Sequence, residues 1–313
     1  MRLAEAHAGN GDPALLTDSF APRYRASRNG LFHLRNNAEG QGFPEPGRRL
    51  SKAFPDRVDR IEAIVAEGHQ VMLHWEMSGT HSGNLFGIPP TGKRFKIWEL
   101  ALFNLAEGKI TEGWFMAEEL ALLVQLGARF PSRNNSAPYM PEPAVGNAAP
   151  EALLDALRAK PNPIPQDRNK ISLLEKKIER LSASDVAAYE AARTSRPKTS
   201  GGSRHIHDYG ESLGYENQAP QVGVRDRLDH IDDLIADGNL VFHRFTLSGI
   251  FSEPWYGLPP TNKFLGTVEA SIQEFDDMGT NTTSRFFVDE LGLVLQIGAL
   301  DKLLDQTGSG KTR

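Results

Sequence analysis

The stretch Leu85–Lys93, LFGIPPTGK, decides the fold of this chain, because Trp255–Lys263, WYGLPPTNK, repeats it after 255 − 85 = 170 residues. The paired prolines fix φ, and the neighbouring glycines adopt backbone conformations that other residues resist. Each stretch therefore predicts a rigid turn. Recurrence of such a turn at long spacing indicates a repeated structural unit.

Two further blocks extend the match outward from the turn. DRIEAIVAEG from Asp59 matches DHIDDLIADG from Asp229 at the same spacing, and both lead into an apolar strand ending in Ser-Gly. EELALLVQLGA at 118–128 matches DELGLVLQIGA at 289–299, with the spacing 289 − 118 = 171 after one inserted residue. Three blocks in register predict that the chain arose by duplication and fusion of one module.

Within each block, short apolar runs are separated by acidic-Gly pairs, which are hairpin signals. The stretch ISLLEKKIERL, 171–181, has apolar residues at helical spacing. A few helices ahead of several antiparallel strands predict the α+β class. We expect two tandem cone-shaped modules, each a curved antiparallel sheet packed on helices, with the concave side as a small-molecule pocket.

Proline density sets the predicted domain boundaries. Eight prolines lie between Pro131 and Pro165, which indicates an irregular linker interrupted by a short helix at 151–160. We predict module 1 at 1–130, a Pro-rich linker at 131–168, module 2 at 169–305 and a flexible tail at 306–313.

Composition narrows the function classes. The 313 residues carry a formal net charge of −5, 39% are hydrophobic, and none is cysteine. Disulfides and thiolate metal sites are therefore excluded. The absence of a basic stripe argues against nucleic-acid binding, and no apolar run is long enough to span a membrane. With no secretory pattern at the start, we expect a cytoplasmic protein.

The sequence SGTHSGNLFGIPPTGKRF at 78–95, followed by EGW at 112–114 and the Leu-rich ending, resembles the SnoaL-like polyketide cyclases, or ester cyclases. These belong to the nuclear-transport-factor-2-like superfamily. The resemblance covers most of 54–128 and, more loosely, 222–299. It implies a hydrophobic small-molecule substrate, no cofactor, and modules that pair through their sheets as an intramolecular pseudo-dimer, with homo-oligomers as a further assembly.

The same resemblance implies an acid/base carboxylate just before the terminal Glu-Leu, which is Glu118 in the first copy and Asp289 in the second. The structural alternative is a carboxylate that the helix dipole stabilises. His33, His205 and His207 are further catalytic candidates. His205 and His207 would share one side of a strand, either as part of a histidine–carboxylate pair or as a two-histidine metal site. We expect no metal, and surface histidines are the simplest reading.

Aromatic and charged side chains near the turn and on the strands are candidates for substrate binding. In the first copy they are Trp75, His81, Trp98, Glu99 and Trp114, and in the second Tyr209, Arg244, Tyr256 and Arg285. The copies differ at these places, since Phe251 stands for His81 and Arg285 for Trp114. The two pockets are therefore chemically unequal. A core tryptophan and an exposed arginine are the structural alternatives.

Two classes of function remain. The first is a cofactor-independent acid/base enzyme that acts on a hydrophobic oxygenated aromatic or polyketide-like molecule, as a cyclase, isomerase, dehydratase or retro-aldol-type lyase. All of these move a proton beside a carbonyl or hydroxyl group. The second is a non-catalytic binding or scaffolding protein.

Overall fold

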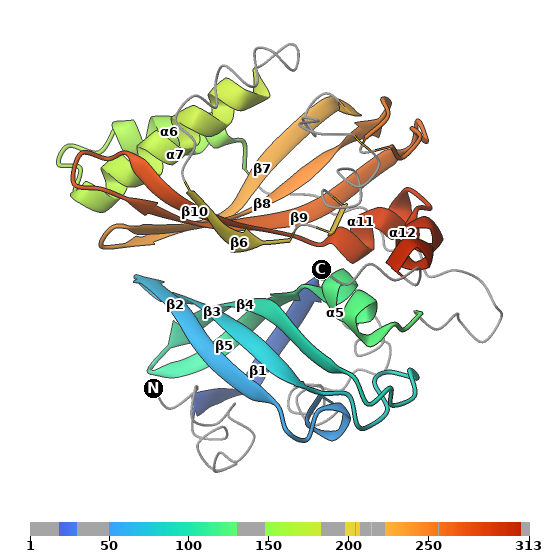
Figure 1. Cartoon of the computed structure of the whole chain (residues 1–313). Helices are drawn as coiled ribbons and strands as arrows, with labels where there is room; N and C mark the ends of the chain where they lie inside the picture. The colour runs from blue at the N-terminus through green and yellow to red at the C-terminus, as the bar shows by residue number, and fades with distance from the viewer. Residues whose placement is uncertain are drawn as a thin grey trace. The chain divides into compact units, whose positions relative to one another are not determined.

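A computed structural model describes residues 19–29, 50–129, 148–182, 198–203, 205–206, 214, 223–255 and 257–307. The chain divides into two compact units, which we describe separately: unit 1 comprises 1–141 and 300–313, and unit 2 comprises 142–299. Figure 1 shows one curved sheet in each unit, labelled along the chain. None of the helices in the described ranges is long and apolar enough to cross a membrane.

Unit 1 contains a five-stranded sheet in the order β1-β5-β4-β3-β2. Strand β1 runs parallel to β5, and the other neighbours are antiparallel. Helix α5 follows β5 and packs against β4. The elements are β1 Phe20–Asn29, β2 Val58–Glu67, β3 Gln70–Thr80, β4 Arg94–Ala106, β5 Lys109–Ala117 and α5 Glu119–Leu126, with α12 Leu300–Thr307 at the end of the chain.

Unit 2 has a sheet of equivalent order, β6-β10-β9-β8-β7, again with its first strand parallel to its neighbour. Two helices precede the sheet and one follows it. The elements are α6 Pro150–Arg158, α7 Pro165–Leu181, β6 Lys198–Gly202, β7 Val224–Asp237, β8 Leu240–Phe251, β9 Phe264–Phe275, β10 Asn281–Val288 and α11 Glu290–Gln296.

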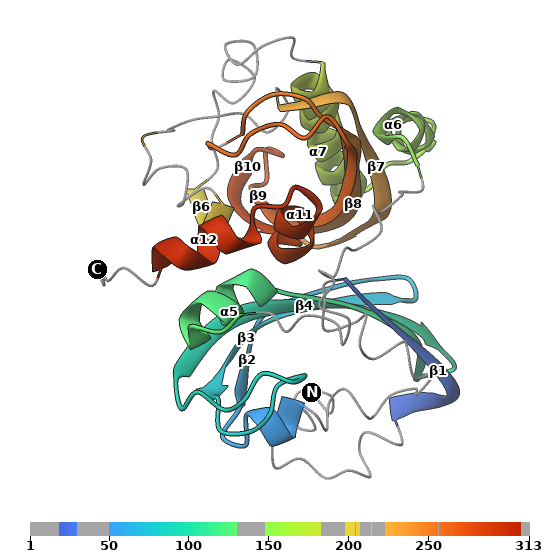
Figure 2. The same ribbon diagram turned by 90° about the vertical axis from the view of Figure 1, so that its right-hand side faces the viewer.

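The sequence repeat corresponds to a repeat of strand register. Trp75 pairs with Glu99 in unit 1, and Phe245 pairs with Glu269 in unit 2, both shifted by 170. A register shift follows Ile61 in β2 and the equivalent Ile231 in β7. The predicted α+β architecture, with two curved sheets and their helices, is therefore confirmed, and Figure 2 shows the curvature of each sheet.

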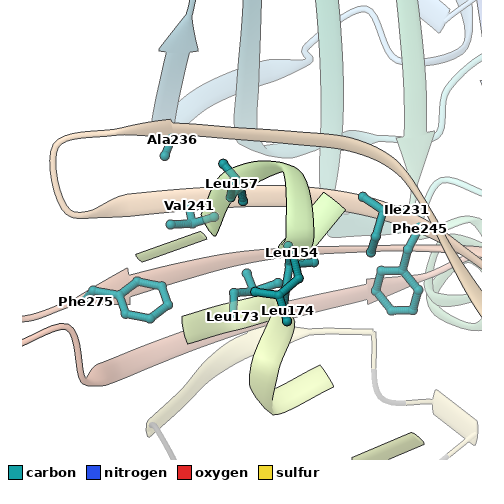
Figure 3. Packing of buried hydrophobic residues seen from close by; sticks show 9 residues of the cluster. All are labelled: Leu154, Leu157, Leu173, Leu174, Ile231, Ala236, Val241, Phe245 and Phe275. Carbon is teal, nitrogen blue, oxygen red and sulfur yellow. The ribbon is translucent and has the colours of Figure 1, made fainter. Parts of the chain in front are cut away.

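One core cluster of unit 2 joins both helices to the sheet (Figure 3). Leucines of α6 and α7 pack on β7, β8 and β9, and the buried members are Leu154, Leu157, Leu173, Leu174, Ile231, Ala236, Val241, Phe245 and Phe275. The short helix expected inside the linker is thus α6, and its apolar face is buried in unit 2. The chain divides into its two compact units at 141/142, and the module bounds expected from the sequence stay a prediction.

We call the face of each sheet that carries Glu99 or Glu269 its inner face, and the opposite face its outer face. Successive side chains of a strand alternate between faces. In unit 2, α7 covers the inner face, because Leu173 and Leu174 pack with Phe245. In unit 1, Phe54 packs on the inner-face side chain of Phe95, with ring centroids 4.4 Å apart.

Candidate functional site

The inner face of unit 1 carries a buried Arg–Asp–Glu group. Arg57 Nε and Nη2 donate to the two carboxylate oxygens of Asp59 at 2.7 and 2.6 Å, a bidentate pair. Arg57 Nη2 also lies 3.9 Å from Glu99, whose side chain is 2% exposed. Burial raises the pKa of Asp59 despite the arginine. The predicted binding residues Trp75 and Glu99 therefore lie together on the inner face.

Unit 2 repeats this group and adds a lysine. Arg227 Nε and Nη2 donate to Asp229 at 2.8 and 3.0 Å, and Lys177 Nζ from α7 lies 2.8 Å from the same carboxylate. Burial alone would raise the pKa of Asp229, but Lys177 and Arg227 together hold it well below its usual range. Two cations thus compensate one buried anion.

Glu269 is the second buried carboxyl group of this arrangement. It is 7% exposed, and within the described ranges it has no hydrogen-bond partner. Burial raises the pKa of Glu269 to about 7, although Arg227 and Lys177 oppose the shift. A carboxyl group with such a pKa can both donate and accept a proton near neutral pH.

A chain of buried polar side chains continues along the inner face of unit 2. His243 Nδ1 lies 2.8 Å from Ser271 Oγ, to which Gln273 Nε2 donates at 3.3 Å, and the Asn281 amide donates to Gln273 in turn. The His243 ring stacks on Phe245, with centroids 4.9 Å apart. Burial lowers the pKa of His243 well below its usual value, so the ring is neutral.

Unit 1 has apolar residues at the positions of this polar chain. The register equivalents of His243, Ser271 and Gln273 are 170 residues earlier, and that of Asn281 is 171 earlier; they are Leu73, Ala101, Phe103 and Ile110. The inner faces therefore share the Arg–Asp–Glu group and differ at the four positions of the polar chain.

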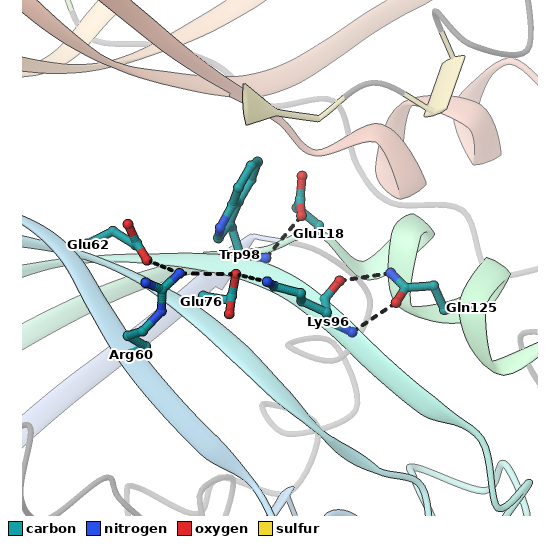
Figure 4. A network of polar contacts seen from close by, with 7 residues as sticks. All are labelled: Arg60, Glu62, Glu76, Lys96, Trp98, Glu118 and Gln125. Atoms are coloured by element: carbon teal, nitrogen blue, oxygen red, sulfur yellow. Dashed lines mark hydrogen bonds and ion pairs between the residues drawn. The ribbon is translucent and has the colours of Figure 1, made fainter. Parts of the chain in front are cut away.

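Glu118, a predicted acid/base residue, lies on the outer side. Its carboxylate accepts from the Trp98 backbone N–H at 3.0 Å, and Figure 4 shows it rising from the same side of the sheet as the Trp98 ring. Burial raises the pKa of Glu118 to about 7, and the Trp98 hydrogen bond opposes this. In the register Glu118 follows Ala117, the partner of Glu99, so the structure does not bring its carboxylate to the inner face.

Asp289, its counterpart, is the N-cap of α11. Its Oδ1 accepts from the Gly292 backbone N–H at 2.9 Å, which is the helix-stabilising role expected of a capping aspartate. Burial raises the pKa of Asp289 to about 6. Val288 pairs with Glu269, so Asp289 is displaced from the inner-face position by one residue.

The glutamine that the two Leu-rich endings share makes the same backbone contacts in both units. Gln125 of α5 bonds the backbone of Lys96 in β4, through Oε1 at 2.8 Å and Nε2 at 2.9 Å. Gln296 of α11 makes the same two bonds to Gly266 in β9, at 3.0 and 2.9 Å. These endings therefore fix α5 to β4 and α11 to β9.

Several predicted substrate-binding residues lie on the outer faces, because their partners in the register are outer-face residues. Trp114 pairs with Leu102, and Arg285 with Ile272. Arg244 forms an ion pair with Asp233, Nε to Oδ2, at 2.6 Å. The outer-face set is Trp98, Trp114, Arg244 and Arg285. A shift of one residue along a strand moves a side chain to the other face of the sheet, and the position of a motif in the chain does not fix that face.

His81, which follows β3, is fully buried against the PPTG turn at 89–92. Its Nδ1 accepts from the Thr91 backbone N–H at 3.3 Å, and its backbone N–H donates to the carbonyl of Lys93 at 2.9 Å. Its ring also packs near Phe54, at 5.7 Å between centroids. The side chain thus holds the turn in place.

Of the remaining candidate site residues, the structure describes only His205. His33, His207, Tyr209 and Tyr256 lie outside the described residues. The backbone N–H of His205 donates to Glu290 at 3.3 Å. Among the residues with described positions, no group of three or more His, Asp or Glu side chains is arranged to hold a metal ion.

The sequence carries a signal for the inner-face Arg–Asp–Glu group. The pattern Arg-x-Asp occurs at 57–59, at the start of β2, and again at 227–229, within β7. When both copies have the same charged residues at equivalent positions, those residues are expected to make the same buried interaction. His243 had no such signal, because its counterpart is Leu73.

Fold and site together define an α+β protein of two curved sheets, in which buried ionisable groups line the face under the helices. The family model described as SnoaL-like polyketide cyclase matches residues 1–126. The aklanonic acid methyl ester cyclase DauD of Streptomyces sp. (strain C5) is 35% identical over 114 residues, which cover 35% of this chain and 71% of DauD. DnrD of Streptomyces peucetius, which is also an aklanonic acid methyl ester cyclase, is 31% identical over 103 residues. The match covers 32% of this chain and 71% of DnrD. The chain belongs to the SnoaL-like polyketide cyclase family.

Solved structures give further similarities. IdmH from Streptomyces antibioticus is 27% identical with a TM-score of 0.33, covering 40% of this chain and 94% of IdmH. TsrD from Streptomyces laurentii is 26% identical with a TM-score of 0.33, and the match covers 40% of this chain and 90% of TsrD. Family membership supports cyclase chemistry on a polyketide-like small molecule.

Proposed function

We propose that the protein is a cofactor-independent acid/base enzyme that closes or rearranges a carbon ring in a polyketide-like aromatic substrate, and that the reaction takes place on the inner face of unit 2. One observation carries the location. Glu269 is a buried carboxyl group, free of hydrogen bonds to the described residues, with a pKa of about 7 on the helix-covered face. Such a group exchanges protons readily at neutral pH.

The surroundings of Glu269 suit this task. Lys177 and Arg227 are held by Asp229, so positive charge is present nearby without an ion pair to Glu269 itself. The Phe245 ring stands directly opposite Glu269 in the register and lies under the Lys177 ammonium, 3.1 Å from the ring centroid. An enolate or phenolate that forms beside these groups would be stabilised by the two cations.

A second function, binding without turnover, is favoured for unit 1. Its inner face has the Arg57–Asp59 pair and Glu99, but Leu73, Ala101 and Phe103 occupy the positions of the polar chain. In this proposal unit 1 holds a ligand or supports the fold, and unit 2 performs the chemistry.

The test is conversion of aklanonic acid methyl ester, the substrate named for the relatives, by the purified protein without added cofactor. Glu269→Gln keeps the size of the side chain and removes its proton transfer, so we expect turnover to fall about 10²–10⁴-fold. Glu99→Gln in unit 1 is the matched control and retains turnover. Equal rates for wild type and Glu269→Gln would refute the assignment, and a ligand that binds unchanged would support the binding function instead.

A further inference from the structure

The polar chain on the inner face of unit 2 has no role in the function proposed above. It consists of His243, Ser271, Gln273 and Asn281, all of them buried. Unit 1 has apolar residues at the same four positions, so the architecture does not require polar ones. A buried polar atom without a hydrogen bond is costly, and Asn281 Oδ1 has no partner among the described residues. The chain therefore calls for a use other than stability.

The hydrogen bonds of this chain run in one direction and set the tautomer of His243. The Asn281 amide donates to Gln273, and Gln273 Nε2 donates to Ser271 Oγ at 3.3 Å. Ser271 still has its own hydroxyl hydrogen to donate, and His243 Nδ1, at 2.8 Å, is the acceptor among the described residues. A ring nitrogen that accepts carries no hydrogen, so the neutral imidazole has its hydrogen on Nε2. The chain thus makes His243 Nε2–H a hydrogen-bond donor.

This donor borders open space. Within the described ranges His243 Nε2 has no hydrogen-bond partner, and unlike Asn281 Oδ1 it is not a fully buried atom. The 4% of His243 that is exposed therefore includes Nε2. The carboxyl oxygens of Glu269 also have no partner there and are also not fully buried. Each group can therefore be reached by at least a water-sized part of a ligand.

The charges around His243 favour a ligand oxygen that carries negative charge. Burial lowers the pKa of His243, Lys177 and Arg180 of α7 lower it further, and Asp229 of β7 opposes them only in part. The ring is therefore neutral and lies where positive charge prevails. A ligand atom that meets Nε2–H must accept a hydrogen bond. A carbonyl oxygen that becomes an enolate or phenolate oxygen suits both conditions.

We propose that His243 binds a carbonyl oxygen of the substrate through Nε2–H and stabilises the negative charge that develops on that oxygen, and that Ser271 positions the imidazole by fixing its tautomer. This inference rests on the proposed function and adds a substrate-binding donor to it; the imidazole itself transfers no proton. Stacking on Phe245, with the rings 7° from parallel, fixes the plane of the donor. Unit 1 has Leu73 at this position and lacks the donor.

The first test is the tautomer, read from ¹⁵N chemical shifts of the histidine side chains in the full-length protein at neutral pH. The His243 signals are assigned by their loss in His243→Leu. We expect Nε2 protonated and Nδ1 unprotonated in wild type, and a mixture of both tautomers in Ser271→Ala. Protonated Nδ1 in wild type would overturn the proposal.

The second test measures the hydrogen bond itself, by infrared spectroscopy of aklanonic acid methyl ester bound to Glu269→Gln, in which turnover is slow. A hydrogen bond from Nε2–H weakens the carbonyl double bond, so we expect a carbonyl band of the bound substrate to move to lower frequency. This displacement should be lost when His243→Leu is added and kept when His243→Gln is added, because glutamine retains an N–H donor. The same spectrum with and without His243→Leu would contradict the proposal.

The third test is turnover of the same substrate. His243→Leu introduces the residue of unit 1, so the fold should tolerate it, which thermal unfolding verifies. We expect kcat to fall about 10²–10³-fold in His243→Leu and to recover most of this loss in His243→Gln, which has a donor but no basic nitrogen. His230→Leu, on the outer face of unit 2, is the control and keeps the wild-type rate.

Equal losses in His243→Leu and His243→Gln would contradict the role as donor. If Glu269→Gln loses turnover and His243→Leu keeps it, this inference alone fails. If both variants keep the wild-type rate, the proposed function fails as well.

Discussion

Glu99 and Glu269 occupy the same position in two sheets of equivalent strand order, each opposite an aromatic residue of the preceding strand. Each lies beside a bidentate Arg–Asp pair on the inner face. Only Glu269 also has a lysine from a covering helix and a buried histidine beside it. The two units therefore share one charged framework and differ in the residues around it.

Glu118 should affect stability more than catalysis. Its pKa is raised to about 7, so the folded protein keeps a proton that the unfolded chain loses near its ordinary value of 4.5. The stability that this proton contributes is complete below about pH 4.5 and is lost as the pH rises through 7. Glu118→Gln should therefore match wild type in acid and exceed it by on the order of 1–3 kcal/mol at about pH 8, measured by urea unfolding. A gain of the same size from Glu107→Gln, in an exposed turn, would show that the effect is not specific.

The stability that the Asp229 carboxylate contributes should depend on pH in the opposite direction. Its pKa is held below the ordinary value of 3.8, so its contribution is present above about pH 4 and is lost as the pH falls further. Asp229→Asn leaves Lys177 buried without its anion and should cost about 2–4 kcal/mol at neutral pH, with a smaller difference near pH 2. Asp59→Asn is the comparison. Because the pKa of Asp59 is raised and not lowered, this variant should show a different pH trend from Asp229→Asn. The same pH trend for both variants would contradict these charge assignments.

Helix α6 should behave as part of unit 2. Leu154 is 7% exposed and packs in the cluster with Leu173 and Ile231. Leu154→Ala should lower the free energy of unfolding by about 2–4 kcal/mol, because it leaves a cavity. Leu153→Ala, a half-buried neighbour on the same helix, should cost less. A negligible effect at Leu154, measured by chemical denaturation, would favour the interpretation of this segment as linker.

Much of the fold could be predicted from the sequence, because repeated blocks such as LFGIPPTGK report turns and strand register in both copies. The site was harder to predict. Glu118 and Asp289 stand at strand-to-helix junctions, where a motif fixes position in the chain but not the face of the sheet. His243 contacts Ser271 on the adjacent strand, and such cross-strand contacts have no local sequence pattern.

The identity of the acid is tested most directly by the pH dependence of kcat/KM for aklanonic acid methyl ester, compared among wild type, Glu269→Gln and Asp289→Asn. The pKa of Glu269 is about 7 and that of Asp289 about 6, both raised by burial, so the two carboxyl groups would give different profiles. We predict that wild type loses activity above about pH 7 as Glu269 loses its proton, that Asp289→Asn keeps this profile, and that Glu269→Gln is slow and lacks the transition. A Glu269→Gln enzyme with the wild-type rate and profile, or an Asp289→Asn enzyme without the transition, would contradict the assignment of the acid to the inner face of unit 2.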